Sequence, residues 1–341
     1  MEILVHKTLF YKKNKIISHL FSKGKVAMDV VFIILNWNKA QLTIQAVKSV
    51  ELTENCNFAI IVIDNGSEKD ERVQLIKFAE ENEWKILNEG DNFEGFYDRI
   101  LLLTNDNYGY AKGNNLGLKL ASSLNFTWAI VMNNDVILEK PVTSTLLKLS
   151  SLDKRIALIG PKIIGIDGKK QGPFRKPGLL DRVFCPLFYP VCYPIKKIME
   201  YLKLKRDISR PYNKIIYPYR LMGCFLLLNL NALEEVGWFD ENTFLYGEEL
   251  ILSEKLINHG YRIAYTEEVY VKHIHEATTS QLGEKRALMQ LNSELYYFEK
   301  YRGYGRIRLL LIKFGFFYSY LFLVPILELF KKALKFIFRR K

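Results

Sequence analysis

The chain has 341 residues, of which 49% are hydrophobic and 25% are charged, close to the averages for globular proteins. This length allows one large α/β domain with an appendage, and the composition excludes a disordered chain or a polytopic membrane protein. The 49 Lys and Arg against 37 Asp and Glu give a formal charge of +12, which favours a polyanionic partner: nucleic acid, anionic lipid or a phosphorylated substrate.

The N-terminal residues 1–28 are basic, with six lysines between short apolar pieces. This mixture does not match a cleavable secretory signal, and we expect a basic N-terminal arm, either facing a membrane or preceding a start at Met28. The four cysteines form no CxxC pair and have no zinc-like spacing with the histidines, which fits a reducing compartment.

The first predicted unit is βαβ. Residues 30–35 (VVFIIL) form a continuous, largely β-branched run, typical of a buried parallel strand, and apolar residues recur at helical spacing from Gln41. A second run at residues 58–63 (FAIIVI) ends in the turn-forming sequence Asp64-Asn65-Gly66-Ser67.

A second cycle follows, with helices predicted near residues 71–82 and 111–122 and strands at residues 100–103 and 128–132. Four predicted strands therefore end in polar residues. Ligands bind beyond the carboxyl ends of the strands in open parallel sheets, so we expect these residues to line one crevice. They are Asn36, Asp64, Asn105 and Asp135.

In the second half, strands are predicted at residues 156–163 and 221–228. Residues 179–195 are aromatic and broken by three prolines, so we expect no regular element there. With the basic cluster that follows, this segment forms either a surface suited to a lipid or lipid-phosphate acceptor or a solvated loop. The cluster consists of Lys196, Lys197, Lys203, Lys205 and Arg206.

Near the C-terminus, residues 314–327 are free of charge and lie between two groups of cations. A membrane span needs roughly 20 apolar residues, and this run is shorter and contains Pro325. We therefore expect an interfacial or re-entrant helix whose cations meet anionic headgroups, with a helix packed on the main domain as the alternative. The cations are Arg306, Arg308 and Lys313 before the run, and Lys331, Lys332, Lys335 and Arg339 after it.

Residues 104–117 (TNDNYGYAKGNNLG) are rich in glycine and asparagine. Gly109, Gly113 and Gly117 lie four apart, so on a helix they present one smooth face for close packing. The amides can bind ribose and sugar hydroxyls without adding charge that repels a diphosphate, and roles in the fold are the alternative for half of them. They belong to Asn105, Asn107, Asn114 and Asn115.

Sugar transfer from a nucleotide donor requires a base for the acceptor hydroxyl and a cation for the leaving diphosphate. Asp135 ends a buried strand and offers a carboxylate for a hard divalent cation, with a helix cap as the alternative. Glu248 and Glu249 follow an aromatic run and offer a base. His273 and His275 point to the same face of a strand, where one can complete the metal shell, although such a pair is more often ordinary surface.

Six motifs stand in a fixed order along the chain: ILNWN, VIDNGS, NDNYGYAKGNNLG, MNNDV, GCFLLLNLNALEEVGWFDENTFLYGEEL and VKHIH. Together they resemble family 2 glycosyltransferases of the GT-A fold, in particular the bacterial rhamnosyltransferase-like branch. The resemblance implies an α/β fold with a mostly parallel, Rossmann-like sheet flanked by helices. It further implies a GT-A domain over residues 29–285. From the apolar run and its cations, we expect residues 286–341 to form a C-terminal helical, amphipathic segment that associates with a membrane.

The resemblance also implies roles for single residues. Glu249 matches the second acidic position of the family's Glu-Asp pair and is the expected base; because it is Glu where Asp is usual, Glu248 stays a candidate. Asp135 stands in the aspartate-containing metal motif, and His273 or His275 matches a later histidine that binds the metal or the diphosphate. The expected nucleotide-sugar-binding residues are Asn36, Asp64, Asn65, Asn105, Gly109, Asn114 and Asn133.

The resemblance therefore predicts an inverting glycosyltransferase that depends on Mn²⁺ or Mg²⁺. It would move a sugar from a nucleotide-diphosphate-sugar, such as dTDP-rhamnose or a UDP-hexose, to a lipid-linked or polysaccharide acceptor in cell-surface glycan synthesis. We expect it at the cytoplasmic face of the plasma membrane, peripheral or monotopic. An anionic membrane rather than nucleic acid is the expected partner, because the cations gather beside apolar runs.

Two other classes of protein share some of these features. A nicotinamide-dependent oxidoreductase also begins with βαβ units, but no GxGxxG follows residues 30–35, and no acidic residue stands about 20 residues after such a motif. A noncatalytic scaffold that binds a sugar nucleotide or a membrane partner stays open because of the unusual Glu249.

Overall fold

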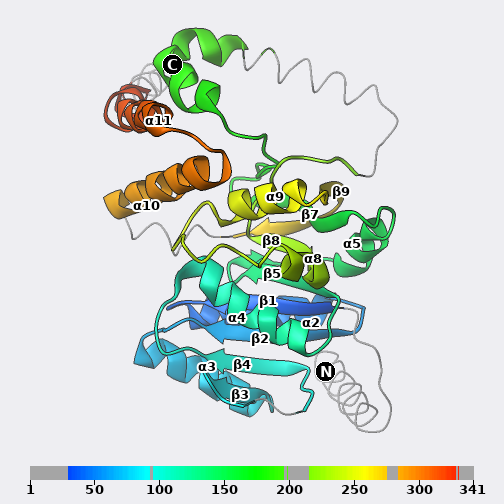
Figure 1. Ribbon diagram of the computed structural model, residues 1–341. Coiled ribbons are helices and arrows are strands. Elements are labelled where there is room, and N and C mark those ends of the chain that lie inside the picture. The colour runs from blue at the N-terminus through cyan, green and yellow to red at the C-terminus, as the bar shows by residue number, and fades with distance from the viewer. Residues whose placement is uncertain are drawn as a thin grey trace, which may run out of the picture.

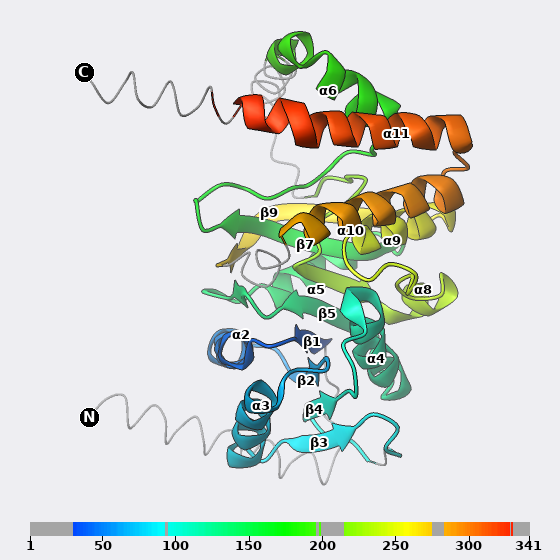
Figure 2. The ribbon, with the colours of Figure 1, turned by 90° about the vertical axis from the view of Figure 1, so that its left-hand side faces the viewer.

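A nine-stranded sheet forms the centre of the computed structural model, and helices cover both of its faces (Figures 1 and 2). The structure describes residues 30–92, 95–195, 198, 215–274, 283–327 and 329. The expected N-terminal arm, the basic cluster from Lys196 to Arg206, His275 and the cations beyond residue 330 lie outside these residues.

Five strands in the first half of the sheet run parallel in the order β3-β4-β2-β1-β5, joined by α2, α3 and α4. Their apolar runs are the predicted strands, except for the edge strand β3, whose four residues are too few to show a pattern. The elements are β1 (Val30–Asn36), α2 (Ala40–Thr53), β2 (Phe58–Asp64), α3 (Lys69–Glu81), β3 (Lys85–Asn88), β4 (Arg99–Leu103), α4 (Gly109–Ser123) and β5 (Trp128–Asn133).

The second half of the sheet mixes directions, since β8 is antiparallel to β5 and β7, β9 is parallel to β7, and β6 is antiparallel to β9. Five of the eight pairings in the whole sheet are parallel, which confirms the mostly parallel sheet. The strand predicted from residue 221 begins at Phe225, because Gly223 and Cys224 form a turn. The elements are β6 (Val136–Ile137), α5 (Thr143–Ser150), β7 (Ile156–Gly165), β8 (Phe225–Asn229), α8 (Leu230–Glu235), α9 (Glu248–Asn258) and β9 (Arg262–His273).

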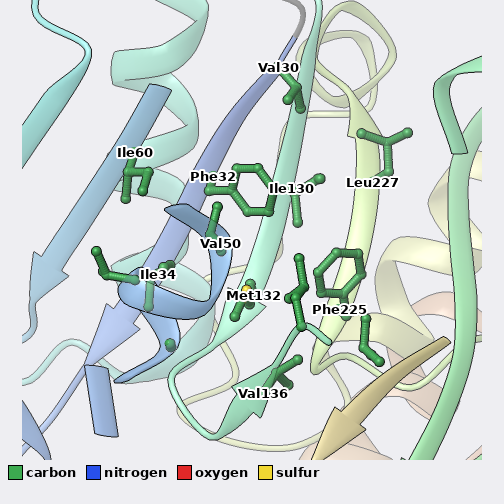
Figure 3. Close-up of a cluster of buried hydrophobic side chains, with 14 of the residues drawn as sticks. Val30, Phe32, Ile34, Val50, Ile60, Ile130, Met132, Val136, Phe225 and Leu227 are labelled. Carbon is green, nitrogen blue, oxygen red and sulfur yellow. The ribbon is translucent and has the colours of Figure 1, made fainter. Parts of the chain in front are cut away.

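Alternate residues of each strand point to opposite faces of the sheet and fill two cores. In β1, Val30, Phe32 and Ile34 pack with α2, α3 and α5, while Val31 and Ile33 pack with α4, α8 and α9. Figure 3 shows the first of these cores, to which β5 and β8 also contribute. Because both faces are buried, the strands are continuous apolar runs rather than alternating ones.

Helix α4 approaches the sheet closely, as the spacing of its glycines predicts. A Cβ at Gly117 would lie 2.7 Å from Cδ1 of Ile63 and 2.8 Å from Cγ2 of Ile33, and one at Gly113 would lie 2.8 Å from Cδ1 of Leu35. Gly109 differs, because it starts the helix with φ +76°. The smooth helix face is therefore confirmed for Gly113 and Gly117.

Residues 179–195, which we call the proline segment, are helical, so the expectation of no regular element there is wrong. A π-helical turn, η1 (Leu180–Phe184), leads into α6 (Cys185–Leu187), and residues 189–195 are helical again after a break at Phe188. Pro186 and Pro190 each stand in the first turn of a helical piece, where the missing N–H is not needed.

The C-terminal helices form an outer layer beyond α9, at the end of the molecule opposite β3 (Figures 1 and 2). They are α10 (Gly283–Tyr296), η3 (Tyr297–Tyr301), α11 (Arg306–Tyr318) and η4 (Ser319–Leu323). Among the described residues, Arg306–Leu327 is one continuous helix that is long and apolar enough to cross a membrane, and 11% of its most apolar stretch is buried. The charge-free run is thus the end of a longer helix.

A third hydrophobic core joins this outer layer to the proline segment and to α9. Its buried residues are Val183, Leu250, Ile251, Tyr297, Phe298 and Ile312. Buried polar contacts reinforce the junction: Glu254 of α9 accepts hydrogen bonds from Tyr297 (3.0 Å), Lys176 (2.9 Å) and Tyr219. The outer layer is therefore packed on the helix that begins with Glu248 and Glu249.

The close contact of α4 with the sheet predicts a large cost for a branched side chain at position 117. Gly117→Val should lower the free energy of unfolding by about 2 kcal/mol, because the new side chain overlaps Ile33 and Ile63. Urea denaturation measures the change. Lys119→Val, at an exposed position of the same helix, is the matched control, and equal losses in the two variants would contradict the packing argument.

Candidate active site

The carboxyl ends of β1, β2, β4 and β5 meet at one edge of the sheet, as the sequence predicts. Asn36 pairs with Asp64 in the register of β1 and β2, Asp64 with Leu103 of β4, and Leu35 with Asn133 of β5. Polar side chains that are far apart in the sequence are thereby neighbours along this edge.

A buried hydrogen-bond network connects these strand ends. The amide nitrogen of Asn36 donates to Oδ1 of Asp64 and to Oγ of Ser67, both at 3.0 Å, and its oxygen accepts from Thr43 at 2.7 Å. Asn134 donates to Thr43 at 3.0 Å. Asn36 is fully buried, so its amide connects β1, β2, α2 and the turn after β5. It has no exposed surface of its own at this edge of the sheet.

Asp64 lies at the centre of a second set of contacts. Its Oδ2 accepts from Nε of Arg72 at 2.7 Å, and the same guanidinium donates to the carbonyl of Thr104 at 2.6 Å. The carboxylate is fully buried, with both oxygens hydrogen-bonded. Each oxygen can accept more than one hydrogen bond, so a nucleobase donor remains compatible with this geometry.

The glycine- and asparagine-rich loop is fastened to the end of β2 by Asn65. The amide of Asn65 donates to Oδ1 of Asn107 (3.0 Å) and to the carbonyl of Gly109 (3.1 Å), and its oxygen accepts from the N–H of Tyr108 (3.1 Å). A Cβ at Gly109 would lie 2.9 Å from the ring of Phe244, so this glycine permits the approach of residues 244–247.

The other expected donor-binding asparagines differ in environment. The side chain of Asn105 is exposed on the rim, and its backbone N–H donates to Glu89 at 3.1 Å. Asn114 is fully buried, and its Oδ1 has no hydrogen-bond partner although its nitrogen donates to the carbonyl of Tyr110. Asn133 is half-buried at the end of β5. Asn115 is used within the fold, since it bonds the backbone of Phe239 on both sides of its amide.

Asp135 and His273 form a buried pair at the turn after β5 and the end of β9. Oδ1 of Asp135 lies 3.2 Å from Nε2 of His273, is buried, and makes no hydrogen bond. Nδ1 of His273 lies 2.8 Å from the amide oxygen of Gln171, which can only accept. Nδ1 of His273 therefore donates to Gln171, and Nε2 is the ring nitrogen directed towards Asp135.

This pair fits a divalent cation. Carboxylate oxygen and imidazole nitrogen suit Mn²⁺, and an acceptor held on the second ring nitrogen is the usual orientation of a metal-binding histidine. No third His, Cys, Asp or Glu joins the pair within the part of the chain that the structure describes. A cation here would need further ligands, and phosphate oxygens of a donor are of the right chemical type.

Glu248 and Glu249 are placed by a strained turn. Tyr246 and Gly247 both have positive φ (+70° and +89°), and α9 begins directly after them. The first turn of a helix carries the positive end of its dipole, which favours carboxylates there. Glu249 lies over the backbone of Gly223, where a Cβ would come within 2.7 Å of its Cγ and 2.8 Å of its Cδ.

The candidate carboxylates raise the pKa values of two buried groups, Tyr110 and Cys224. Burial raises the pKa of Tyr110 well above 10, and Glu249, Glu248 and Asp135 raise it further. Burial likewise raises the pKa of the Cys224 thiol, with contributions from Asp135 and Glu249. The hydroxyl of Tyr110 donates to the carbonyl of Gly223 at 2.7 Å. Asp135 and Glu249 are therefore both near enough to Tyr110 and Cys224 to raise the pKa values of these groups.

Glu248 and Glu249 differ in their access to solvent. Glu248 is 2% exposed and its Oε1 has no hydrogen-bond partner, while Glu249 is half-buried. Burial, and then the charge of Glu249, raise the pKa of Glu248 well above 4.5. A solute can therefore reach Glu249 more readily, and Glu248 retains its proton to higher pH than an ordinary glutamate.

Sequence reasoning missed several residues that shape this site. Gln171 contacts His273 across 102 residues, and Arg72 contacts Asp64 from one turn into α3. Gly223 stands in the motif GCFLLLN, but nothing in its spacing shows that Glu249 packs against it. Such partners follow from the fold, so local pattern could not reveal them.

Comparison with known proteins gives two findings. Residues 31–198 match the family model Glycosyl transferase family 2, and no curated protein matches the sequence. Among solved structures, the chain is similar to a crystal structure of GalNAc-T7 with UDP, GalNAc and Mn²⁺, with 13% identity and a TM-score of 0.57. The match covers 82% of this chain and 50% of the other, so this chain spans about half the length of that protein. The likeness confirms the expected GT-A fold.

The raised pKa of Glu248 predicts a pH-dependent gain in stability for Glu248→Gln. The folded protein holds this proton more tightly than the unfolded chain, so its stabilising effect is complete below about pH 4.5 and is lost as the pH rises towards the folded pKa. The variant should be more stable than the native protein at neutral pH, by on the order of 1 kcal/mol.

Thermal unfolding between about pH 4 and pH 8 measures this difference. It should shrink towards the acid end of the range, where the native glutamate is protonated in both states. Glu80→Gln, at an exposed position in α3, is the control and should show a small, constant offset. Parallel curves for Glu248→Gln and the native chain would contradict the assignment.

Proposed function

Residues 31–198 match the model of the glycosyl transferase family 2, and from this premise we propose that the chain is an inverting, metal-dependent glycosyltransferase acting on a nucleotide-diphosphate-sugar. The observation that carries the proposal is the buried Asp135–His273 pair together with Glu249, because Asp135 and Glu249 both act on Tyr110 and Cys224. The UDP and Mn²⁺ in the GalNAc-T7 structure support testing these two ligands first.

The donor lies along the strand ends in this proposal. Asp64, with Asn36 and Asn65 around it, faces the nucleoside, while the α4 start at Gly109, the rim at Asn105 and the buried amide of Asn114 shape the rest of the pocket. The unpartnered Oδ1 of Asn114 supports a ligand role, because a buried amide oxygen without a donor costs free energy. Asn133 lies between this pocket and Asp135.

Glu249 is the base in a single displacement. As the acceptor oxygen bonds to the anomeric carbon, the bond from that carbon to the diphosphate oxygen breaks, and the acceptor's proton passes to the Glu249 carboxylate. Attack and departure occur on opposite faces, so the configuration inverts. A cation held by Asp135 and His273, and by His275 if it lies close, would supply positive charge to the leaving diphosphate.

The acceptor in this proposal is lipid-linked or a growing polysaccharide at the cytoplasmic face of the plasma membrane. The cationic, apolar C-terminal helix and the proline segment support a membrane-borne acceptor. A dTDP-rhamnose or UDP-hexose donor follows from the motif resemblance of the sequence. In this proposal, the contacts around Asp64 and Asn114 determine which donor binds.

The first experiment is calorimetry of UDP, dTDP and GDP with the purified chain, with and without Mn²⁺. We expect one nucleotide to bind with Mn²⁺ present, and Asp135→Ala to weaken this metal-dependent binding at least tenfold. Gln171→Leu removes the acceptor that orients His273 and should weaken Mn²⁺ by about tenfold, while Gln171→Glu keeps the acceptor and should restore it. If folded protein binds none of the three, a noncatalytic scaffold becomes the better account.

The base assignment predicts a loss of turnover without a loss of donor binding. Glu249→Gln should lower kcat by roughly 10²–10⁴, and its KM for the donor should change little. Gly223→Ala should resemble it, because the new Cβ displaces the Glu249 carboxylate. Glu80→Gln and Gly178→Ala are the matched controls, since Glu80 is exposed and a Cβ at Gly178 meets nothing within 4 Å. Full activity of Glu249→Gln would exclude this residue as the base.

A further inference from the structure

We propose that the proline segment and the helix Arg306–Leu327 form one surface that lies in the plane of an anionic lipid bilayer and fixes the height of α9 above it. The proposal deepens the proposed function, and it rests on that function for its purpose, which is access to a membrane-borne acceptor. Neither segment alone suffices, because each supplies part of the same apolar face.

The surface is unusually apolar for one in contact with water. On the proline segment, Phe184, Phe188 and Val191 are 50–61% exposed. On the C-terminal helix, Leu310, Phe314 and Leu321 are 56–63% exposed. Soluble monomers rarely leave this many large apolar side chains of two neighbouring segments in water, which points to a partner.

The two segments are packed together through Gly315. A Cβ at this glycine would lie 3.1 Å from the carbonyl carbon of Arg182 and 3.1 Å from Cα of Val183, so the helix backbone rests on η1. Ile312 and Val183 are buried in the third core on the same side. Figures 1 and 2 both show α6 and α11 side by side at the outer end of the molecule. The exposed residues therefore belong to one surface.

The charges on the helix identify an anionic bilayer as the partner. Arg306–Leu327 carries Arg306, Arg308 and Lys313, all exposed, and no acidic residue. The three cations stand in the first part of the helix, and the charge-free run follows them. This combination of exposed cations and apolar side chains is typical of helices that bind at the interface of anionic membranes.

The packing favours a helix in the plane of the bilayer over one that spans it. With 22 residues the helix is about 33 Å long, enough to cross a hydrocarbon core of about 30 Å. Gly315, however, is near its middle, and there it contacts Arg182, whose guanidinium pairs with Glu294 of α10. A spanning helix would carry this ion pair to the centre of the bilayer, where charged groups are costly.

The same packing connects the membrane to the candidate base. Leu250 and Ile251, the two residues after Glu249, share the third core with Val183 and Ile312. The position of α9 is therefore fixed relative to the lipid surface by direct contact. A membrane-bound acceptor would meet Glu249 at a height that this core determines.

The test is co-sedimentation of the full chain with phosphatidylcholine vesicles, with and without phosphatidylglycerol. We expect binding that depends on phosphatidylglycerol. Phe184→Ser with Phe188→Ser, and Phe314→Ser with Leu321→Ser, should each weaken it at least about tenfold. Arg306→Gln, Arg308→Gln and Lys313→Gln should each weaken it about fivefold, and only in the anionic vesicles. Leu152→Ser with Ile166→Ser, at exposed positions away from this surface, should bind like the native chain.

Other results would overturn the proposal. Native affinity in both double variants would exclude this surface, and a dimer that dissociates in the same variants would identify a second copy as its partner. Resistance of the native chain in bacterial membranes to alkaline extraction would show a spanning helix. Calorimetry of UDP with Mn²⁺ on each variant separates the two proposals, because a failed membrane test with intact nucleotide binding leaves the transferase function standing.

Discussion

The buried hydrogen bond between the side chains of Asn36 and Asp64 is the constraint on which the rest of the site depends. It joins the ends of β1 and β2, and further hydrogen bonds of Thr43, Asn134 and Arg72 extend this network to α2, the turn before Asp135 and the end of β4. An amide and a carboxylate that are fully buried must be satisfied within the protein. This network therefore fixes the position of the polar residue at the end of each strand.

A second feature of the site is its group of negatively charged side chains. Burial and the charges of Asp135, Glu248 and Glu249 raise the pKa of Tyr110, and burial, Asp135 and Glu249 raise that of Cys224. A fold gains no stability from assembling carboxylates around groups that cannot neutralise them, and such arrangements are characteristic of functional sites. The positive φ of Tyr246, two residues before Glu248, is a second local cost at the same place.

The sequence was sufficient for features that arise from local pattern. Continuous apolar runs predicted the buried strands, their polar ends predicted the edge where Asn36, Asp64 and Asp135 lie, and glycine spacing predicted the close approach of α4. It failed where a partner is distant, as with Gln171 behind His273. It also could not show that Asn65 holds the following loop, or that prolines at the first turn allow residues 179–195 to be helical.

The outer layer of helices is held by the third core and not by the two cores of the sheet. The two cores of the sheet contain no residue of α10 or α11, whereas Val183 and Ile312 are buried in a separate core that they share with Leu250, Ile251 and Tyr297. Glu254 adds a polar tie in the same place: burial acts to raise its pKa, but hydrogen bonds from Tyr219, Lys176 and Tyr297 lower it. Helix α9 thus belongs to both units: its first turn carries Glu248 and Glu249 at the candidate site, and Leu250 and Ile251 lie in the core beneath the apolar surface. In our proposal, this single turn of α9 links the membrane-facing surface to Glu249, the proposed base.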